Sequence, residues 1–167
     1  METIEYRTTD KSGWGEGPWQ QEPDKKQWQD AVTGYPCLIV RNRGGALCGY
    51  VGVATGHPCF GLDYDKVGAE VHGGLTFADR CSPNADESKH ICHKTDGDDH
   101  VWWLGFDCSH YGDISPAYEM QNRERGERSF GDGYETYKDF RYVTNEVALL
   151  AKQLKAIEVT SAETARD

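Results

Sequence analysis

The chain has 167 residues, a formal net charge of −10 at pH 7 and a hydrophobic share of 37%. This length suits one domain with a buried core, and this apolar share excludes a disordered composition. Because an acidic surface repels nucleic-acid backbones and anionic membranes, we expect no direct binding to nucleic acid and no membrane partner. A small-molecule substrate or a basic protein surface is the more compatible partner.

The N-terminal residues METIEYRTTDKSG contain no apolar stretch of the kind found in secretory signals. No segment approaches the ~18 apolar residues of a membrane span. We therefore expect a cytoplasmic protein, and we expect its six cysteines to be reduced. Cys37 and Cys48 lie in apolar surroundings, where cysteine usually acts as an inert hydrophobic residue.

The first predicted elements lie in the N-terminal third of the chain. Residues 1–21 are polar, and they predict an arm that docks its two tryptophans onto the body. Segment 22–34 predicts a short helix, with Trp28 and Val32 four residues apart on its buried face. Residues 36–55 predict a β-hairpin, because two apolar runs flank an Arg-Gly-Gly turn.

Two further strands are predicted, over residues 71–78 and 101–109. The segment between them, 80–100, is a long polar loop, and loops of this length inside compact domains are usually functional or mobile. Both faces of the 101–109 strand are apolar before Asp107, which is typical of a strand covered on both sides. Residues 111–136 are expected to be irregular.

The clearest element is a helix over residues 136–158. Thr136 with Asp139 resembles a capping box at its start, and residues 159–167 are expected to fray. Its apolar residues recur three and four positions apart, as a helix with one buried face requires: Phe140, Val143, Val147, Leu150, Leu154 and Ile157.

These elements predict an α+β fold, with a small, mainly antiparallel sheet, long loops and a C-terminal amphipathic helix packed on the sheet. We expect a single domain over residues 1–167. Its parts are an arm at 1–21, a core at 22–158 and a flexible tail at 159–167.

The end of the 101–109 strand is the first candidate site. Asp107 follows apolar surroundings that could tune its pKa for general-base work, and His110 and Asp113 come where the chain breaks at Gly112. An aspartate three residues after a histidine can orient the imidazole or join it in binding a metal. The alternative is that both aspartates cap local backbone and His110 is an exposed loop residue.

The second candidate site is the segment around two adjacent glycines. His72 and Thr76 could act on a substrate, while the backbone at Gly73 and Gly74 lets a substrate oxygen approach closely. Arg41, at the end of a predicted strand, could pair with a buried aspartate or with a substrate anion. The alternative for His72–Thr76 is a bulge at the edge of the sheet with a structural histidine. The alternative for Arg41 is an ordinary polar residue at the surface.

A third candidate is a zinc site, because zinc favours cysteine and histidine ligands. Such an ion could pin the 80–100 loop to the end of the 101–109 strand through Cys81, either Cys92 or His93, and Cys108. The alternative is that these thiols are small buried residues beneath a solvated loop.

Four motifs occur in order along the chain: PCLIVRN, LCGYVGV, VHGGLTFA and WWLGFDCSHYGD. Together they resemble a family of uncharacterised proteins found in bacteria and their phages, and the resemblance spans most of residues 14–154. It implies a phage or prophage origin and one compact domain. The family brings no assigned activity, so the resemblance implies no catalytic residue.

The leading hypothesis is a small cytoplasmic, phage-related hydrolase that acts on a small polar or phosphorylated substrate, with or without a metal such as zinc. The alternative is a non-enzymatic phage accessory protein that inhibits a host protein or sequesters a signalling nucleotide. A zinc-stabilised scaffold without catalysis is the third hypothesis. The sequence contains no P-loop, Rossmann, GxSxG or HExxH motif, so ATP hydrolysis by a P-loop, Rossmann-type redox chemistry and esterase chemistry have no support.

Overall fold

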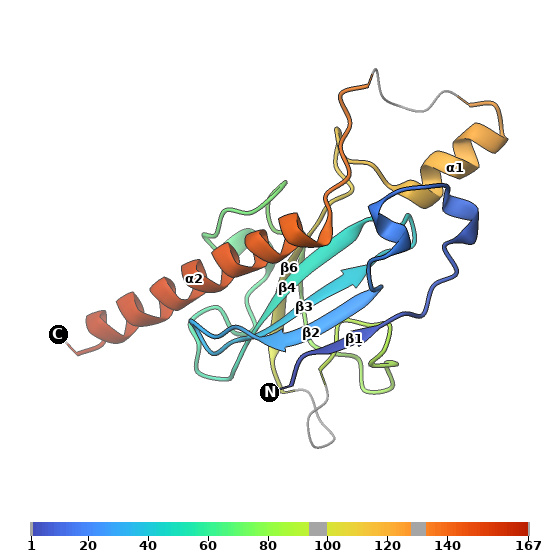
Figure 1. Cartoon of the computed structure of the whole chain (residues 1–167). Coiled ribbons are helices and arrows are strands. Elements are labelled where there is room, and N and C mark those ends of the chain that lie inside the picture. Colours follow the sequence, from blue (N-terminus) through green and yellow to red (C-terminus); the bar gives the residue numbers. More distant parts are fainter. Residues whose placement is uncertain (1, 94–99, 128–132, 167) are drawn as a thin grey trace.

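The computed structural model describes residues 2–93, 100–127 and 133–166 and contains one antiparallel sheet and two α-helices (Figure 1). The strands are β1 (Ile4–Tyr6), β2 (Lys25–Gln29), β3 (Pro36–Arg41), β4 (Leu47–Val53), β5 (Phe77–Asp79) and β6 (Trp102–Asp107). Their order across the sheet is β1-β2-β3-β4-β6-β5, and every neighbouring pair is antiparallel. The α+β prediction is therefore confirmed, and so is the hairpin of β3 and β4.

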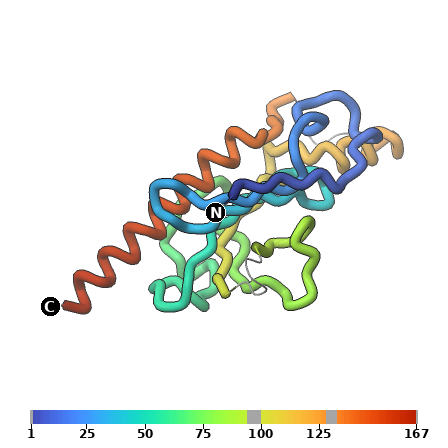
Figure 2. The backbone as a smooth tube through the Cα atoms, turned by 60° about the horizontal axis from the view of Figure 1, so that its bottom comes forward, coloured from blue at the N-terminus to red at the C-terminus, as the bar shows by residue number. Residues whose placement is uncertain are grey.

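Both faces of the sheet are covered. The long helix α2 (Phe140–Thr164) packs on one face, where Ile39 and Val51 meet its buried side chains Val147 and Leu150. Because side chains alternate along a strand, every second residue points to the opposite face. There a second buried cluster forms, made of Leu38, Val40, Cys48, Tyr50 and Trp103. Figure 2 shows α2 on one side of the sheet and the 80–93 segment on the other.

Strand β6 lies between β4 and β5, as its two apolar faces predict. Trp103, Leu104 and Phe106 are all at most 1% exposed. Asp107 is the last residue of the strand, so its carboxylate stands at the rim of the buried sheet.

The helix predicted for 22–34 is wrong, because this segment contains strand β2. Along β2 the side chains alternate between the two faces of the sheet: Lys25 and Gln27 face one side, while Trp28 packs into the core under α2. Val32, expected to be buried, is 76% exposed in the turn after the strand. Pairing with β1 and β3 outweighs the weak helical pattern of this segment.

The strand predicted for 71–78 is also largely wrong. Gly73 and Gly74 adopt φ values of 66° and 84°, which an extended strand does not allow, and only Phe77–Asp79 forms β5. His72, Gly74 and Thr76 therefore do not share a strand face.

Two predictions about helices are corrected. Helix α1 (Pro116–Glu124) forms within the segment expected to be irregular, with proline at its first turn. Helix α2 continues to Thr164 beyond the edge of the sheet, where a frayed tail was expected (Figure 1). The side chain of Asp139 caps α2 by accepting a hydrogen bond from the backbone N–H of Tyr142 at 2.8 Å, and Thr136 lies outside the helix.

The N-terminal arm docks beside α1, as Figure 1 shows, through two short 3₁₀ turns, Ser12–Trp14 and Pro18–Gln20. Trp19 meets the ring of Tyr137 edge-on, with 5.1 Å between the ring centroids. The docking of the tryptophans predicted from the sequence is confirmed, although β1 also makes the arm part of the sheet.

Candidate histidine–aspartate site

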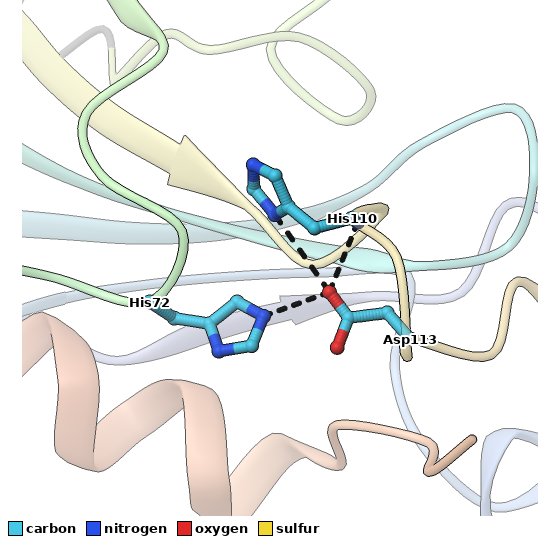
Figure 3. A group of neighbouring side chains, drawn as sticks. All are labelled: His72, His110 and Asp113. Atoms are coloured by element: carbon cyan, nitrogen blue, oxygen red, sulfur yellow. Dashed lines mark hydrogen bonds and ion pairs between the residues drawn. The ribbon is translucent and has the colours of Figure 1, made fainter. Parts of the chain in front are cut away.

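Three of the predicted site residues meet at one end of the sheet. His72 comes from the loop between β4 and β5, while His110 and Asp113 come from the turn after β6 (Figure 3). The turn is closed by a hydrogen bond from the N–H of Asp113 to the carbonyl of His110 at 2.9 Å. Within the described part of the chain, this is the one group of three or more histidine, cysteine or acidic side chains whose ligand atoms all lie within 4.8 Å of one another.

Asp113 is the centre of the site, with a side chain only 2% exposed. Its Oδ2 lies 2.7 Å from Nε2 of His72 and accepts a hydrogen bond from the backbone N–H of His110 at 3.0 Å (Figure 3). A short parallel bridge to Thr136 fixes the backbone of Asp113. The carboxylate is thus held in place by both backbone and side chains.

His72 is held from two sides by α2. Its Nδ1 lies 2.9 Å from the hydroxyl of Tyr142, and its backbone N–H donates to Oε2 of Glu146 at 2.8 Å. Burial, and then the negative charge of Glu146, raises the pKa of Tyr142, so its phenol is protonated at neutral pH. The imidazole of His72 is therefore oriented before any ligand arrives.

His110 has a different environment. Its Nδ1 is buried and has no hydrogen-bond partner among the described residues. The same atom lies 3.7 Å from Oδ2 of Asp113 and 3.8 Å from Oδ1 of Asp107, which is too far for hydrogen bonds. A buried nitrogen that faces two carboxylate oxygens without bonding either of them has the placement of a metal ligand or of a proton donor to a bound molecule.

Asp107 and Thr76 form the outer part of the site. The hydroxyl of Thr76 donates to Oδ2 of Asp107 at 2.9 Å, and the backbone N–H of Ser109 donates to Oδ1 at 3.0 Å. The five predicted catalytic residues are therefore brought to one place: His72, Thr76, Asp107, His110 and Asp113. The hydroxyl of Thr76 orients a carboxylate in this arrangement.

The three central donors could hold a divalent metal if one pair of them moved apart. With zinc–ligand bonds of about 2.0–2.2 Å, the ligands of a tetrahedral ion lie roughly 3.3–3.6 Å apart. The 3.7 Å between His110 Nδ1 and Asp113 Oδ2 is close to this spacing. The 2.7 Å between His72 Nε2 and Asp113 Oδ2 would have to open by roughly 0.7 Å. Two histidines and one carboxylate also leave a coordination position open for water or substrate.

The predicted zinc ligands of the 80–100 loop are not assembled. Cys81 and Cys92 are joined in a disulfide, so neither sulfur is a thiolate, and the prediction that all six cysteines are reduced is wrong. His93 instead lies with its Nδ1 2.6 Å from Nε2 of Gln27. Burial, and then the charge of Asp113, raises the pKa of the Cys108 thiol, which disfavours its thiolate.

The predicted substrate-binding residues have other roles. Arg41 does pair with a buried aspartate, Asp24, but no donor of its guanidinium is left for a substrate. Its five N–H donors are directed to Asp24, Glu22, the hydroxyl of Tyr137 and the carbonyls of Pro23 and Gly45.

Gly73 and Gly74, predicted to let a substrate oxygen approach, also have structural roles. The N–H of Gly74 donates to the carbonyl of Val71 at 2.9 Å, so it is used within its own turn. Gly73 lies against the ring of His110, where an added Cβ would stand 2.3 Å from a ring carbon. Its absent side chain makes room for an imidazole rather than for a substrate oxygen.

Three residues that contact the candidate site were missed in the sequence: Lys138, Tyr142 and Glu146. Tyr142 and Glu146 are four residues apart and immediately precede the buried Val143 and Val147, so the helical period places them at the edge of the buried stripe. This spacing was the signal available for them. Lys138, whose Nζ lies 3.5 Å from Oδ1 of Asp113, precedes the helix and carries no such signal.

No protein-family model, curated protein or solved structure matches the chain. The site must therefore be interpreted from its geometry. None of the helices in the described ranges is long and apolar enough to cross a membrane.

Proposed function

We propose that the chain is a small metal-dependent hydrolase in which His72, His110 and Asp113 hold one divalent ion, with zinc as the first candidate. The observation that carries the proposal is the buried Nδ1 of His110, which has no hydrogen-bond partner in the described chain and faces the same oxygen of Asp113 that His72 contacts. A metal there would lower the pKa of a bound water to near neutrality.

The chain's own residues supply the remaining functions. Tyr142 orients His72 from the outside, as partners of metal-bound histidines commonly do. Asp107 stands next to His110, with 31% of its side chain exposed, and is the candidate general base for a water bound at the open position. Thr76 fixes the orientation of this base by donating to its second oxygen.

Metal binding is tested by titrating the full chain with zinc in a calorimeter. We expect one ion per chain, and we expect His110→Ala to weaken the affinity at least about tenfold, since it removes one of three ligands. His90→Ala is the matched control, because this exposed histidine lies outside the cluster and its Nδ1 contacts the carbonyl of Asp86. Equal affinities for the native chain and His110→Ala would contradict the site.

Turnover is tested with a panel of small esters, amides and phosphoesters, with the zinc-loaded chain and after chelation. Loss of turnover on chelation and in Asp107→Asn, with the fold unchanged, would support the hydrolase. If zinc instead raises the melting temperature and no substrate is turned over, the site belongs to a scaffold without catalysis.

We further propose a phage-related origin and a cytoplasmic location, as the sequence predicts. The Cys81–Cys92 disulfide makes the location the point to test, since glutathione and thioredoxin keep most cytosolic thiols reduced. Fractionation of cells checks it: we expect the chain in the cytosolic fraction, and its recovery only outside the cytosol would contradict this location.

A further inference from the structure

The same site carries a cation that the metal proposal does not use. Lys138 lies in the short segment before α2, and its Nζ is 3.5 Å from Oδ1 of Asp113. Its side chain is 19% exposed, and the ammonium also contacts the hydroxyl of Thr136 and lies 5.5 Å from the ring centroid of Tyr142. The lysine is thus held beside the site and not extended into solvent.

The two oxygens of Asp113 face different partners. Oδ2 faces the two histidines, and Oδ1 faces Lys138. A metal on Oδ2 and the ammonium on Oδ1 would therefore stand on either side of one carboxylate. Two neighbouring positive charges of this kind match a ligand that offers several negative oxygens.

From this placement we propose that the substrate of the site is a phosphomonoester, and that Lys138 binds its phosphate beside the metal. This inference rests on the proposed function, which supplies the metal. A lysine ammonium binds phosphate as a compact point charge. Among the described residues one of its three N–H donors goes to the hydroxyl of Thr136, and the ammonium only pairs with Asp113 at 3.5 Å, so a donor is left for a phosphate oxygen.

The charges around the site strengthen the need for this lysine. Asp107 and Glu146 lie close to His110 and His72, and the chain as a whole carries a net charge of −10. These carboxylates repel an anionic substrate, so binding it requires local positive charge. A neutral ester or amide would gain nothing from Lys138.

The reaction balances with water as the co-reactant. The oxygen of a bound water forms a bond to phosphorus, and its proton passes to Asp107. The bond between phosphorus and the ester oxygen breaks, and the leaving alkoxide takes back the proton held by Asp107 to become the alcohol, which restores the Asp107 carboxylate. The products are inorganic phosphate and an alcohol.

The test uses the full chain loaded with one equivalent of zinc, with excess metal removed by gel filtration, and inorganic phosphate as the probe. We expect Lys138→Met to weaken phosphate binding at least tenfold, whereas Lys138→Arg should retain most of it. Zinc affinity should be unchanged or higher in Lys138→Met, because a cation near the ligand carboxylate is removed. Lys155→Met is the control, since Lys155 pairs with Glu158 elsewhere on α2.

The outcomes separate the inference from the proposed function. Equal phosphate affinity in the native chain and Lys138→Met would overturn the phosphate subsite alone. Loss of both zinc and phosphate binding in Lys138→Met would show that the lysine only supports Asp113, and it would also overturn the inference. Failure of the native chain to bind zinc, seen before phosphate is added, would overturn the metal site and the inference with it.

Discussion

Two adjacent glycines have different physical reasons to be glycine. Gly73 and Gly74 both have positive φ, where a side chain is strained. Only Gly73 also stands against a ring of the candidate site, because a Cβ there would overlap the imidazole of His110, whereas a Cβ at Gly74 would meet nothing within 4 Å. Substitutions at these two positions therefore distinguish two effects: both would strain the backbone, and only the one at Gly73 would also displace His110.

We predict that Gly73→Ala and Gly74→Ala each lose about 1 kcal/mol of stability from backbone strain, and that only Gly73→Ala loses metal affinity. The reason is that the new methyl group pushes His110 away from Asp113. Thermal unfolding and zinc titration of both variants check this. If both variants bind zinc like the native chain, the contact between Gly73 and His110 does not position the site.

Arg41 and Lys138 show how the number of free donors decides a cation's role. All five donors of Arg41 are used by residues 22–24, the β3–β4 turn and Tyr137, so its charge holds the segment before β2 in place. Lys138 has a partner on one carboxylate oxygen and remains partly exposed. The sequence pointed to the arginine as an anion binder, and nothing in its local pattern distinguished the two cations.

At the scale of elements, α2 joins the core to the site. Its stripe, Val143, Val147 and Leu150, is completely buried against the sheet. Tyr142 and Glu146, next to that stripe, hold His72. A shift of the helix along the sheet would therefore move the imidazole as well as the core.

The cap of α2 gives a prediction at this scale. Asp139→Ala removes the hydrogen bond to the N–H of Tyr142 and should cost about 1 kcal/mol. Ser115→Ala is the matched control, because Ser115 occupies the same position before α1 but makes no capping hydrogen bond through its side chain. Chemical denaturation measures both. A control that is as destabilised as Asp139→Ala would show that helix propensity, and not the cap, is responsible.

The elements that the sequence predicted well are those with long, regular apolar patterns. The β3–β4 hairpin, β6 and α2 each bury a face whose period is visible in the residues. Strand β2 was mistaken for a helix because Trp28 and Val32 mimic a helical spacing, and pairing with two neighbouring strands is not visible locally. Helix α1 was missed because its pattern is mostly polar.

At the scale of the whole molecule, the site depends on two loops that are distant in the sequence. The residue types of His72, His110 and Asp113 suggested chemistry, but their meeting is set by sheet order, which places β6 between β4 and β5. The two cysteines of the 80–93 segment suggested zinc as well, and in the fold they bond to each other instead. Sequence therefore selected candidate residues, and topology decided which of them meet.

The disulfide holds the loop that covers the second face of the sheet. The buried ammonium of Lys25 donates to the carbonyls of Glu87 and Cys92, and Ile91 packs on the same face. Cys81 and Cys92 close this loop across 11 residues, for which the chain-entropy model gives about 3 kcal/mol.

We expect reduction, or the double change Cys81→Ser with Cys92→Ser, to lower the free energy of unfolding by up to about 3 kcal/mol. Zinc binding at His72 and His110 should be retained, because that site does not use these cysteines. Denaturation with and without a reductant measures the first effect, and the double variant, which should not respond to reductant, is the control. No change on reduction would show that the loop is held by its other contacts.

The state of the cysteines has a consequence for covalent labelling. Two are oxidised to each other, and the other four, Cys37, Cys48, Cys59 and Cys108, are at most 5% exposed. Burial raises the pKa of Cys37 and of Cys48 to about 12, so the thiolate that reacts with alkylating agents is scarce. A thiol reagent would therefore modify the chain only as it opens, and the order in which these sulfurs react would report which part of the core opens first.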